Sequence, residues 1–490
     1  MKLVGNSLYS LAGTAIPVVL SVITVPFYLS AIGGERYGAL TIAWLVLGFF
    51  GAADFGIGRA MTRRMATLAT ASSASQAKAL WSGIAAIALF GIIAAALLFA
   101  AAHWYFSAPF EVSDGIRDEV LRSVFLLALC CPIVALNGVL GGALMGLERF
   151  RMTAFATLLG NSGILLLPLA TAYTFSTELP ALVFASLAAR LLATIVLAFS
   201  AGRLFLIASR PTISLHELTQ LTSFGKWIML SALVAPVILM SDRFLIGAFY
   251  DAIAVAAYAI PYQIASRTLL LPIAIGQVLF PHFARQEESK SVEDCRHYAI
   301  FLGQIFAPLI IVLICLSAPL LNLWLGDQLD ERSIAVARIV LIGCWVNAIA
   351  HVPFAFIQGC GNSRFTALLH TAELPIFLAL LAALGSLFGL AGFATAFALR
   401  CLLDCWALVW KAKLGWQELC RALVIPALLL LAALWGSFYF SQLAHLLSFA
   451  VLLVIVVIIA VLRFMPTGIQ EKLQARGATL RLRLSKRKGH

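Results

Sequence analysis

Charged side chains are scarce in this sequence. Asp, Glu, Lys and Arg make up only 11% of its 490 residues, whereas 62% of the residues are hydrophobic. A typical soluble domain carries about 25% charged residues. The composition therefore excludes a soluble globular enzyme and indicates a chain that lies largely in lipid.

The motifs of common enzyme classes are also missing. The sequence contains no glycine-rich phosphate-binding loop, no zinc-protease motif and no nucleophile elbow. Its nine cysteines show neither a secreted disulfide pattern nor a zinc-ribbon spacing. Cys401 and Cys405 share a helix face, and we expect them to be small buried hydrophobic residues. The sequence thus predicts no enzyme, no catalytic residue, no bound metal and no cofactor.

Long apolar segments occupy most of the chain. A helix needs about 20 apolar residues to cross a bilayer core about 30 Å thick. The first segment follows only Met1 and Lys2 and lacks a cleavage site, so we expect it to be retained. The sequence predicts an all-α polytopic membrane protein with about fourteen transmembrane helices, at residues 6–31, 38–60, 79–102, 121–146, 153–175, 180–202, 223–248, 254–280, 298–320, 335–358, 366–386, 390–410, 422–441 and 445–464.

The charges are distributed unevenly between the connecting loops. Lys and Arg exceed Asp and Glu by 12. With both termini in the cytoplasm, most basic residues, such as Arg63 and Arg64, fall on the cytoplasmic side, and acids such as Asp114 and Asp118 face outward. A basic tail at residues 465–490 would lie beside the anionic inner leaflet. Topology explains the positive charge, and we predict no nucleic-acid partner.

Two short pieces of sequence recur at a similar spacing. Residues 15–20 resemble residues 234–239, and residues 146–150 resemble residues 359–365. Six predicted spans separate the copies, so both cross the membrane in the same sense. We therefore predict two pseudo-symmetric six-helix lobes with additional C-terminal segments: an N-terminal lobe at 1–202, a cytoplasmic linker at 203–222, a C-terminal lobe at 223–410, two further helices at 411–464 and the basic cytoplasmic tail at 465–490.

Several motifs at the predicted helix ends carry a family resemblance. They are Val25-Pro26-Phe27-Tyr28, Gly33-Gly34-Glu35-Arg36-Tyr37-Gly38, Asp54-Phe55-Gly56-Ile57-Gly58-Arg59 and Ser241-Asp242-Arg243-Phe244-Leu245-Ile246-Gly247, followed by Tyr258. In order and placement they resemble the polysaccharide flippases, or Wzx-type proteins, of the multidrug/oligosaccharidyl-lipid/polysaccharide exporter superfamily. The resemblance covers nearly the whole chain.

This resemblance implies a two-lobed, V-shaped carrier in the bacterial inner membrane that alternates between inward-open and outward-open states. The implied substrate is an undecaprenyl-pyrophosphate-linked oligosaccharide, and the implied partners are membrane lipids and a glycan polymerase and glycosyltransferases of the same pathway. In the related peptidoglycan-precursor flippases, arginines on the first, second and eighth helices line the cavity. Here Arg267 lies on the matching eighth span, but the first span carries no charge, which favours a different glycan.

Arginines inside the predicted spans are the candidate substrate-binding residues. An ionised side chain at bilayer depth costs at least about 2.5–3.5 kcal/mol, so it normally faces a cavity or a partner. Guanidinium groups bind phosphoryl oxygens through paired charge-assisted hydrogen bonds. Arg267 is the foremost candidate, because no acid lies near it in sequence. The full set is Arg59, Arg190, Arg243, Arg267 and Arg400.

Structural roles remain open for three of these arginines. Arg400 could be neutralised by Asp404, four residues later on the same helix. Arg59 could be an interfacial residue of the cytoplasmic side. Arg243 could join two helices, and we expect it to contact a different helix from its neighbour Asp242, because consecutive residues diverge by about 100° around a helix.

Acids inside the spans are the candidate ion-coupling residues. A carboxylate in the membrane is stabilised by a bound cation or neutralised by a proton. Asp242, Glu373 and Thr395 could offer oxygen ligands to a sodium ion, and Asp54 and Asp404 are further candidates. Transport could be coupled to sodium, to protons or to the membrane potential.

Three other functions compete with flipping. A cation-coupled multidrug exporter of the same superfamily would share the fold. A membrane glycan polymerase or ligase would normally carry a larger external loop than residues 103–120, the longest outer connection predicted here. A channel would also place charged residues in the membrane, but the repeat favours a rocking carrier.

The predicted topology can be tested by cysteine labelling in whole cells. Because the positive-inside bias places the loops after odd-numbered spans outside, cysteines at Gly34 and Asp327 should react with an impermeant reagent. Cysteines at Ser75 and Arg487 should react only after the cells are opened. The reverse pattern would overturn the topology.

Overall fold

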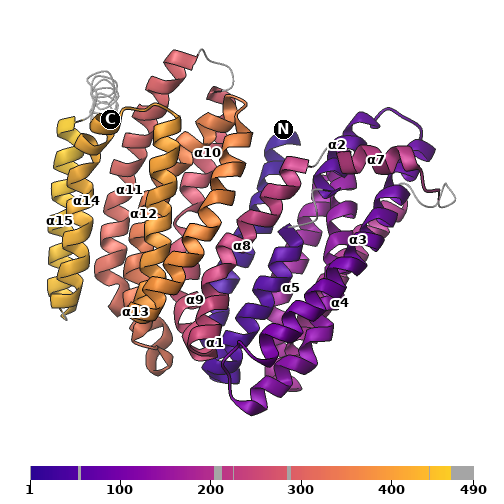
Figure 1. The fold of residues 1–490 in the computed structure, drawn as a ribbon, viewed down its shortest axis with the longest axis horizontal. Coiled ribbons are helices and arrows are strands. Elements are labelled where there is room, and N and C mark those ends of the chain that lie inside the picture. Colours follow the sequence, from indigo (N-terminus) through magenta and orange to yellow (C-terminus); the bar gives the residue numbers. More distant parts are fainter. Residues whose placement is uncertain are drawn as a thin grey trace, which may run out of the picture. The chain divides into compact units, whose positions relative to one another are not determined.

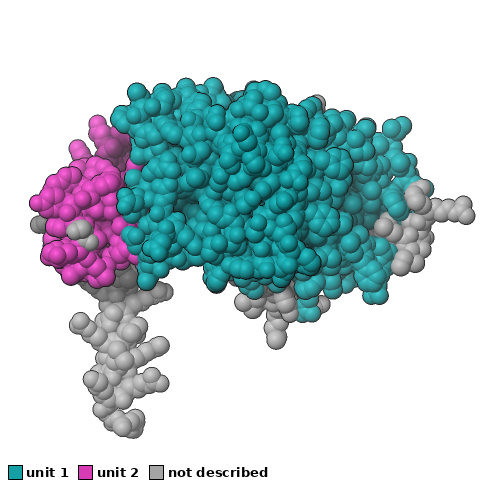
Figure 2. Space-filling model, turned by 90° about the horizontal axis from the view of Figure 1, so that it is seen from below, with its two compact units in different colours: residues 1–264, 321–336, 363–400 teal, residues 265–320, 337–362, 401–490 magenta. Residues whose placement is uncertain are grey.

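Helices joined by short turns form the computed structural model, and no strand occurs in the part of the chain that it describes. The chain divides into two compact units, one of residues 1–264, 321–336 and 363–400 and the other of residues 265–320, 337–362 and 401–490 (Figure 2). The all-α polytopic fold expected from the sequence is confirmed. The division into two six-helix lobes stays a prediction. The described residues are 2–52, 57–203, 212–223, 226–283, 288–440 and 442–464.

Figure 1 shows the helices, and their bounds overlap every predicted span. Nine described helices are long and apolar enough to cross a membrane, and α9 with α10 would make a tenth span, bent by 43°. The helix bounds are α1 Lys2–Ala52, α2 Ile57–Thr67, α3 Ser73–Ser107, α4 Asp114–Gly146, α5 Phe150–Thr174, α6 Leu179–Ala201, α7 Leu215–Ser223, α8 Lys226–Phe249, α9 Ala252–Arg267, α10 Leu270–Phe283, α11 Glu288–Leu325, the 3₁₀ turn η2 Gly326–Gln328, α12 Arg332–Gly359, α13 Ser363–Lys411, α14 Trp416–Tyr439 and α15 Leu443–Phe464.

Two of these elements, α1 and α13, are each a pair of spans joined by a glycine. Gly33 and Gly389 have φ angles of 77° and 62°, which interrupt the helices at the predicted span boundaries. The rings of Tyr28 and Trp44 lie 5.3 Å apart, whereas a straight helix would separate these residues by about 24 Å. The chain therefore reverses at Gly33. Counting both arms of α1 and α13 raises the ten candidate spans to twelve, and α8 and α15 lie at the two remaining predicted spans, which agrees with about fourteen.

Loops that are predicted to share one side of the membrane lie together within the first unit. Glu35, after the first span, accepts a hydrogen bond of 2.6 Å from the backbone N–H of Ser113, after the third. Gly34 lies close to Ile253, which follows the seventh span, and η2, after the ninth, packs against α1. This grouping agrees with the predicted alternation of the loops.

The two turns that the sequence repeat pairs have the same hydrogen-bond pattern. Between α4 and α5, Arg149 N donates to Leu144 O (2.9 Å) around Glu148, whose φ is 58°. Between α12 and α13, Asn362 N donates to Ile357 O (3.0 Å) around Gly361, whose φ is 82°. Both turns are helix C-caps. In each, a backbone N–H donates to the carbonyl oxygen five residues earlier, and the residue just before the donor has a left-handed conformation. The matching geometry supports the repeat at these positions.

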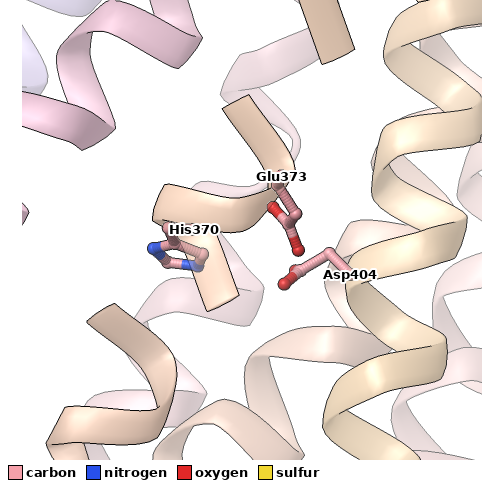
Figure 3. Close-up of side chains that lie close together, drawn as sticks. All are labelled: His370, Glu373 and Asp404. Carbon is pink, nitrogen blue, oxygen red and sulfur yellow. The ribbon is translucent and has the colours of Figure 1, made fainter. Parts of the chain in front are cut away.

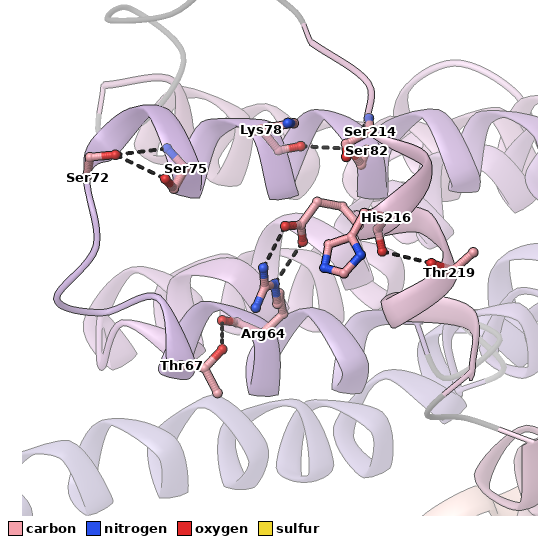
Figure 4. Close-up of polar contacts among 10 residues, drawn as sticks. Arg64, Thr67, Ser72, Ser75, Lys78, Ser82, Ser214, His216 and Thr219 are labelled. Carbon is pink, nitrogen blue, oxygen red and sulfur yellow. Dashed lines mark hydrogen bonds and ion pairs between the residues drawn. The ribbon is translucent and has the colours of Figure 1, made fainter.

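Helix α7 overlaps the second half of the predicted linker at 203–222 and docks on α2 and α3 (Figure 4). Glu217 accepts two hydrogen bonds from Arg64 of α2, at 2.8 and 2.6 Å. The N–H of Ser214, just before α7, donates to the Ser82 hydroxyl of α3 (3.0 Å). The linker is thus fastened to the helices that precede it, through contacts between residues far apart in sequence.

The Arg64–Glu217 pair should make the stability of this docking depend on pH. The hydrogen bonds from Arg64 lower the pKa of Glu217 below its ordinary value of 4.5. A lowered folded-state pKa means that the pair stabilises the fold fully above pH 4.5 and is lost as the pH falls through the folded-state pKa. Glu217→Gln should therefore lower the melting temperature at pH 7, by an amount worth about 1–3 kcal/mol.

The difference between wild type and Glu217→Gln should shrink as the pH is lowered below 4.5, and this can be followed by thermal unfolding in detergent. Glu178→Gln is the matched control, because Glu178 pairs with Arg122 at 3.5 Å while both side chains are more than half exposed. A difference for Glu217→Gln that does not change with pH would contradict this role of the pair.

Candidate functional site

One end of the first unit is closed by contacts between two turns. The turn between α3 and α4 lies against the turn between α8 and α9, and we call this contact of residues 105–111 with residues 244–253, together with the adjoining residues 34–38 of α1, the loop seal. Glu111 N donates to Gly247 O (2.8 Å), and Ala252 N donates to Glu111 O (3.1 Å). The Tyr105 hydroxyl donates to Phe244 O (2.8 Å). Under the predicted topology the loop seal closes the outer side.

Two glycines allow the backbones at the loop seal to approach. A Cβ atom on Gly38 of α1 would lie 1.8 Å from the carbonyl oxygen of Ala252. A Cβ atom on Gly247 would lie 2.7 Å from the Tyr105 hydroxyl and 2.8 Å from the Phe110 ring. Contacts this short do not occur, so any larger residue would push these segments apart. The loop seal is close-packed, but all of these contacts are noncovalent. It can therefore open and close without making or breaking a covalent bond.

A buried charge pair on α8 contacts two tyrosines of α9. Asp242 and Arg243 are 2% and 5% exposed. Arg243 Nη1 donates to Asp242 Oδ1 (2.9 Å) and to Leu239 O (2.5 Å), and the Tyr258 hydroxyl donates to Asp242 Oδ2 (2.8 Å). The Arg243 guanidinium also lies 3.8 Å from the centre of the Tyr262 ring. Both oxygens of Asp242 are thus engaged within the protein.

This geometry corrects the expectation that Asp242 and Arg243 contact different helices. Their Cα–Cβ bonds do diverge, but the arginine side chain is long enough to fold back along α8 and reach its neighbour. Arg243 therefore neutralises Asp242 and packs on α9. This arrangement favours a structural role for both residues over direct contact with a phosphate or a cation.

A second group of charges lies on the two arms of α13. Arg400 Nη1 lies 3.9 Å from Glu373 Oε2, which a straight helix would place about 40 Å away. The Arg400 guanidinium lies 5.9 Å from the Phe397 ring, which in turn packs edge-on against Tyr262 at 5.1 Å. Aromatic rings thus connect the α13 charges to the pair on α8.

Two carboxylates and one imidazole of α13 lie close together beside Arg400. Potential ligand atoms of His370, Glu373 and Asp404 all lie within 4.8 Å of one another, and Figure 3 shows both carboxylates pointing to the same point. This donor set could share a proton or hold a cation, and Arg400 would compete with either. The predicted coupling residues Glu373 and Asp404 belong to it, together with His370, whereas Asp242 and Thr395 do not.

Arg190 of α6 has a different environment from Arg243 and Arg400. It is half-buried, and its Nη1 donates to Asn161 Oδ1 of α5 (3.2 Å). Its Nε has no hydrogen-bond partner, and no acid lies within ion-pair distance of it, among the described residues. Its positive charge is therefore held in the membrane by a neutral amide.

The remaining predicted site residues are dispersed. Arg267 is half-buried and ends α9 at the bend before α10. The Thr395 hydroxyl donates to Ala391 O one turn earlier (2.8 Å). Arg59 lies in α2, but its side chain and the whole of Asp54 lie outside the described residues. All of these assignments stay predictions.

Arg338 of α12 was not among the predicted site residues. It is 5% exposed, and it donates to the Ser317 hydroxyl of α11 (3.1 Å) and to Ser437 O of α14 (2.8 Å). The Phe438 ring lies 4.6 Å from its guanidinium. The same signal that identified Arg267, an arginine within a span and far from acids, would have found it. Its contacts assign it to holding α14 against α11 and α12.

The chain matches a known protein family and is similar to a curated protein. A family model described as polysaccharide biosynthesis protein matches residues 32–334. A protein from Shigella flexneri named "Putative O-antigen transporter" is 28% identical over 411 residues, which are 84% of this chain and 97% of that protein.

Two solved structures have the same fold at low sequence identity. The lipid II flippase MurJ in an inward closed conformation has a TM-score of 0.72 and 15% identity, with 92% of this chain and 97% of that one covered. An inward-facing multidrug resistance MATE family transporter of the MOP superfamily has a TM-score of 0.68 and 15% identity, with 84% and 99% covered. At this identity the likeness concerns the fold alone.

The structural role of the Asp242–Arg243 pair can be tested by a double-mutant cycle. Asp242→Asn leaves a buried guanidinium without its counter-charge and should destabilise the protein by about 3–5 kcal/mol. Arg243→Met should also destabilise it. The double variant has no buried charge and should recover most of the loss, as measured by thermal unfolding and by the folded fraction in detergent.

Asp330→Asn is the control for this cycle. Asp330 pairs with Arg332, but both side chains are more exposed, so its loss should cost about 0–1 kcal/mol. Strictly additive losses at positions 242 and 243 would show that the two side chains do not depend on each other.

Proposed function

The chain belongs to the polysaccharide biosynthesis protein family, and from this premise we propose that it flips an undecaprenyl-pyrophosphate-linked oligosaccharide from the cytoplasmic to the outer leaflet by alternating access. It is a multi-pass membrane protein with the fold of the MOP-superfamily transporters. The observation that carries the proposal is the loop seal. Placement in the bacterial inner membrane with both termini cytoplasmic is part of the proposal.

The loop seal supports alternating access because of how it is made. Two backbone hydrogen bonds, the hydrogen bond from the Tyr105 hydroxyl to Phe244 O and the ring contact of Tyr105 with Phe244 close the turns on each other. Each such hydrogen bond contributes only about 0.5–1.5 kcal/mol net, so thermal motion and substrate binding can open the contact. A carrier needs a closure of this kind at one side while the other side admits substrate.

Arg190 is the arginine whose surroundings best suit a pyrophosphate. Arg243 and Arg400 lie beside acids, which already compensate their charges. Among the described residues only the Asn161 amide accepts a hydrogen bond from the Arg190 side chain, so its remaining N–H groups can donate to phosphoryl oxygens in the paired geometry of a guanidinium. Arg267, at the bend between α9 and α10, is proposed as a second contact.

The group on α13 is proposed to couple transport to a proton or a cation. Its two carboxylates lie near Arg400, so taking up a proton or a cation would change the attraction between the two arms of α13. Sodium, protons and the membrane potential all remain compatible with this arrangement.

A cation-coupled multidrug exporter is the second candidate, because a MATE transporter has the same fold. Its expected substrates are cationic, and the half-buried Arg190 would repel them. A polymerase or ligase is less favoured, since the relatives are named as transporters and flippases. A glycan polymerase and glycosyltransferases of the same pathway are proposed as partners.

Deleting the gene tests the proposed function. The lipid-linked oligosaccharide should accumulate in the cytoplasmic leaflet and be absent from the outer leaflet, as measured by periplasmic accessibility to a glycan-modifying enzyme. Intact surface glycan together with new sensitivity to cationic drugs would favour the multidrug exporter instead.

Replacing Arg190 tests the phosphate contact. Arg190→Ala should lower transport per folded protein by about 10- to 100-fold, the equivalent of one or two charge-assisted hydrogen bonds. Arg190→Lys should restore part of it, because lysine keeps the charge without the paired donors. Arg267→Ala should act in the same direction.

Arg338→Met is the control for these variants. It should lower the amount of folded protein more than the transport per folded molecule, because Arg338 joins α11, α12 and α14. If Arg190→Ala transports at the wild-type rate per folded molecule, Arg190 does not bind the phosphates.

A further inference from the structure

A groove of about 450 Å³ lies between α10 and α12 within the second unit. Its volume falls in the range of small-ligand pockets, about 300–1,000 Å³. The side chains that define its chemistry are Gln277, Phe280, His351, Phe354 and Gln358, and Gly276 leaves space between them. We call it the α10–α12 groove.

Two polar side chains of the α10–α12 groove, Gln277 and His351, are not used to hold the helices together. Gln277 is exposed and His351 is half-buried, and neither makes a side-chain hydrogen bond to another described residue. Both belong to predicted spans eight and ten, where an amide or imidazole facing hydrocarbon would be costly. Their donors and acceptors therefore face water or a polar ligand.

No Asp, Glu, Lys or Arg lines the groove. Amides and an imidazole both donate and accept hydrogen bonds, as the hydroxyl groups of a sugar do. Two phenyl rings, of Phe280 and Phe354, offer flat apolar surfaces to the C–H face of a sugar ring. A phosphate would require cationic donors and a cationic drug would require acids, so the groove suits a neutral polyhydroxyl ligand.

We propose that the α10–α12 groove binds a sugar residue of the transported glycan. This inference rests on the proposed function and adds to it a subsite that binds the glycan. Gln277 and His351 would hydrogen-bond the sugar hydroxyls, and Phe280 and Phe354 would pack on its ring. The subsite distinguishes the glycan-bearing lipid from the bare lipid carrier.

Two variants change the groove by independent means. Gln277→Leu removes the amide but keeps a side chain of similar size. Gly276→Val fills the groove, and it should fold, since a Cβ on Gly276 would meet nothing closer than 3.5 Å. Gly48→Val in α1 is the matched control, because a Cβ there meets nothing within 4 Å.

The test compares two probes with the full-length protein in nanodiscs. One probe is undecaprenyl pyrophosphate, and the other is undecaprenyl pyrophosphate bearing the native oligosaccharide, purified from cells that lack the protein. Wild type and Gly48→Val should bind the glycan-bearing probe more tightly. Gln277→Leu and Gly276→Val should reduce that preference by about tenfold, the effect of one or two hydrogen bonds, and leave affinity for the bare carrier unchanged.

The outcomes separate the subsite from the proposed function. If both variants keep the wild-type preference, or if the wild type shows none, the subsite is wrong while the proposed function stands. If the wild type binds neither probe, the proposed function fails and the subsite fails with it. Each variant must have a melting temperature close to that of the wild type. Gly276→Val and Gln277→Leu must both lower the preference for the glycan-bearing probe.

Discussion

Placing charge inside a hydrocarbon layer is the constraint on which this structure depends. An ionised residue there costs at least about 2.5–3.5 kcal/mol, so each one needs a reason to be in the bundle. Arg243 is neutralised by Asp242 and covered by tyrosine rings, and Arg338 is held by neutral oxygens that tie α14 to its neighbours. Arg190 differs from both, since among the described residues only the Asn161 amide accepts a hydrogen bond from its side chain. The cost of charge in the membrane is thus met by structural contacts at Arg243 and Arg338. At Arg190 these contacts are fewer, which makes Arg190 a functional candidate.

The loop seal and the helix turns show how the same chain can be rigid in parts and still move. Hairpins at Gly33 and Gly389 and the close-packed α5–α6 pair fix local structure through many contacts. The loop seal instead depends on a few backbone hydrogen bonds and on glycines that permit close approach. A contact held by few hydrogen bonds opens easily, as a gate requires, whereas the contacts that define the fold are many.

The sequence predicted the spans well because apolar length and glycine breaks are local signals. It placed the reversal of α1 near Gly33, and it placed both α13 arms. It could not predict that Glu217 would bind Arg64, because the pair is 153 residues apart and only the fold brings it together. It identified Glu373 and Asp404 by their depth in the membrane, but their convergence with His370 depends on the α13 hairpin. The relation of Arg243 to Asp242 was mispredicted because side-chain length, not helix geometry, decides it.

The central claim is that the loop seal must open during transport, and a reversible cross-link tests it most directly. A Cβ on Gly34 would lie 3.9 Å from the Cγ2 atom of Ile253, so the two side chains are in contact and cysteines at these positions are expected to form a reversible disulfide. With the single-cysteine variants as controls, oxidation of the Gly34→Cys/Ile253→Cys protein should stop flipping of the lipid-linked oligosaccharide, and a reductant should restore it. Flipping at the wild-type rate by fully cross-linked protein would contradict the account.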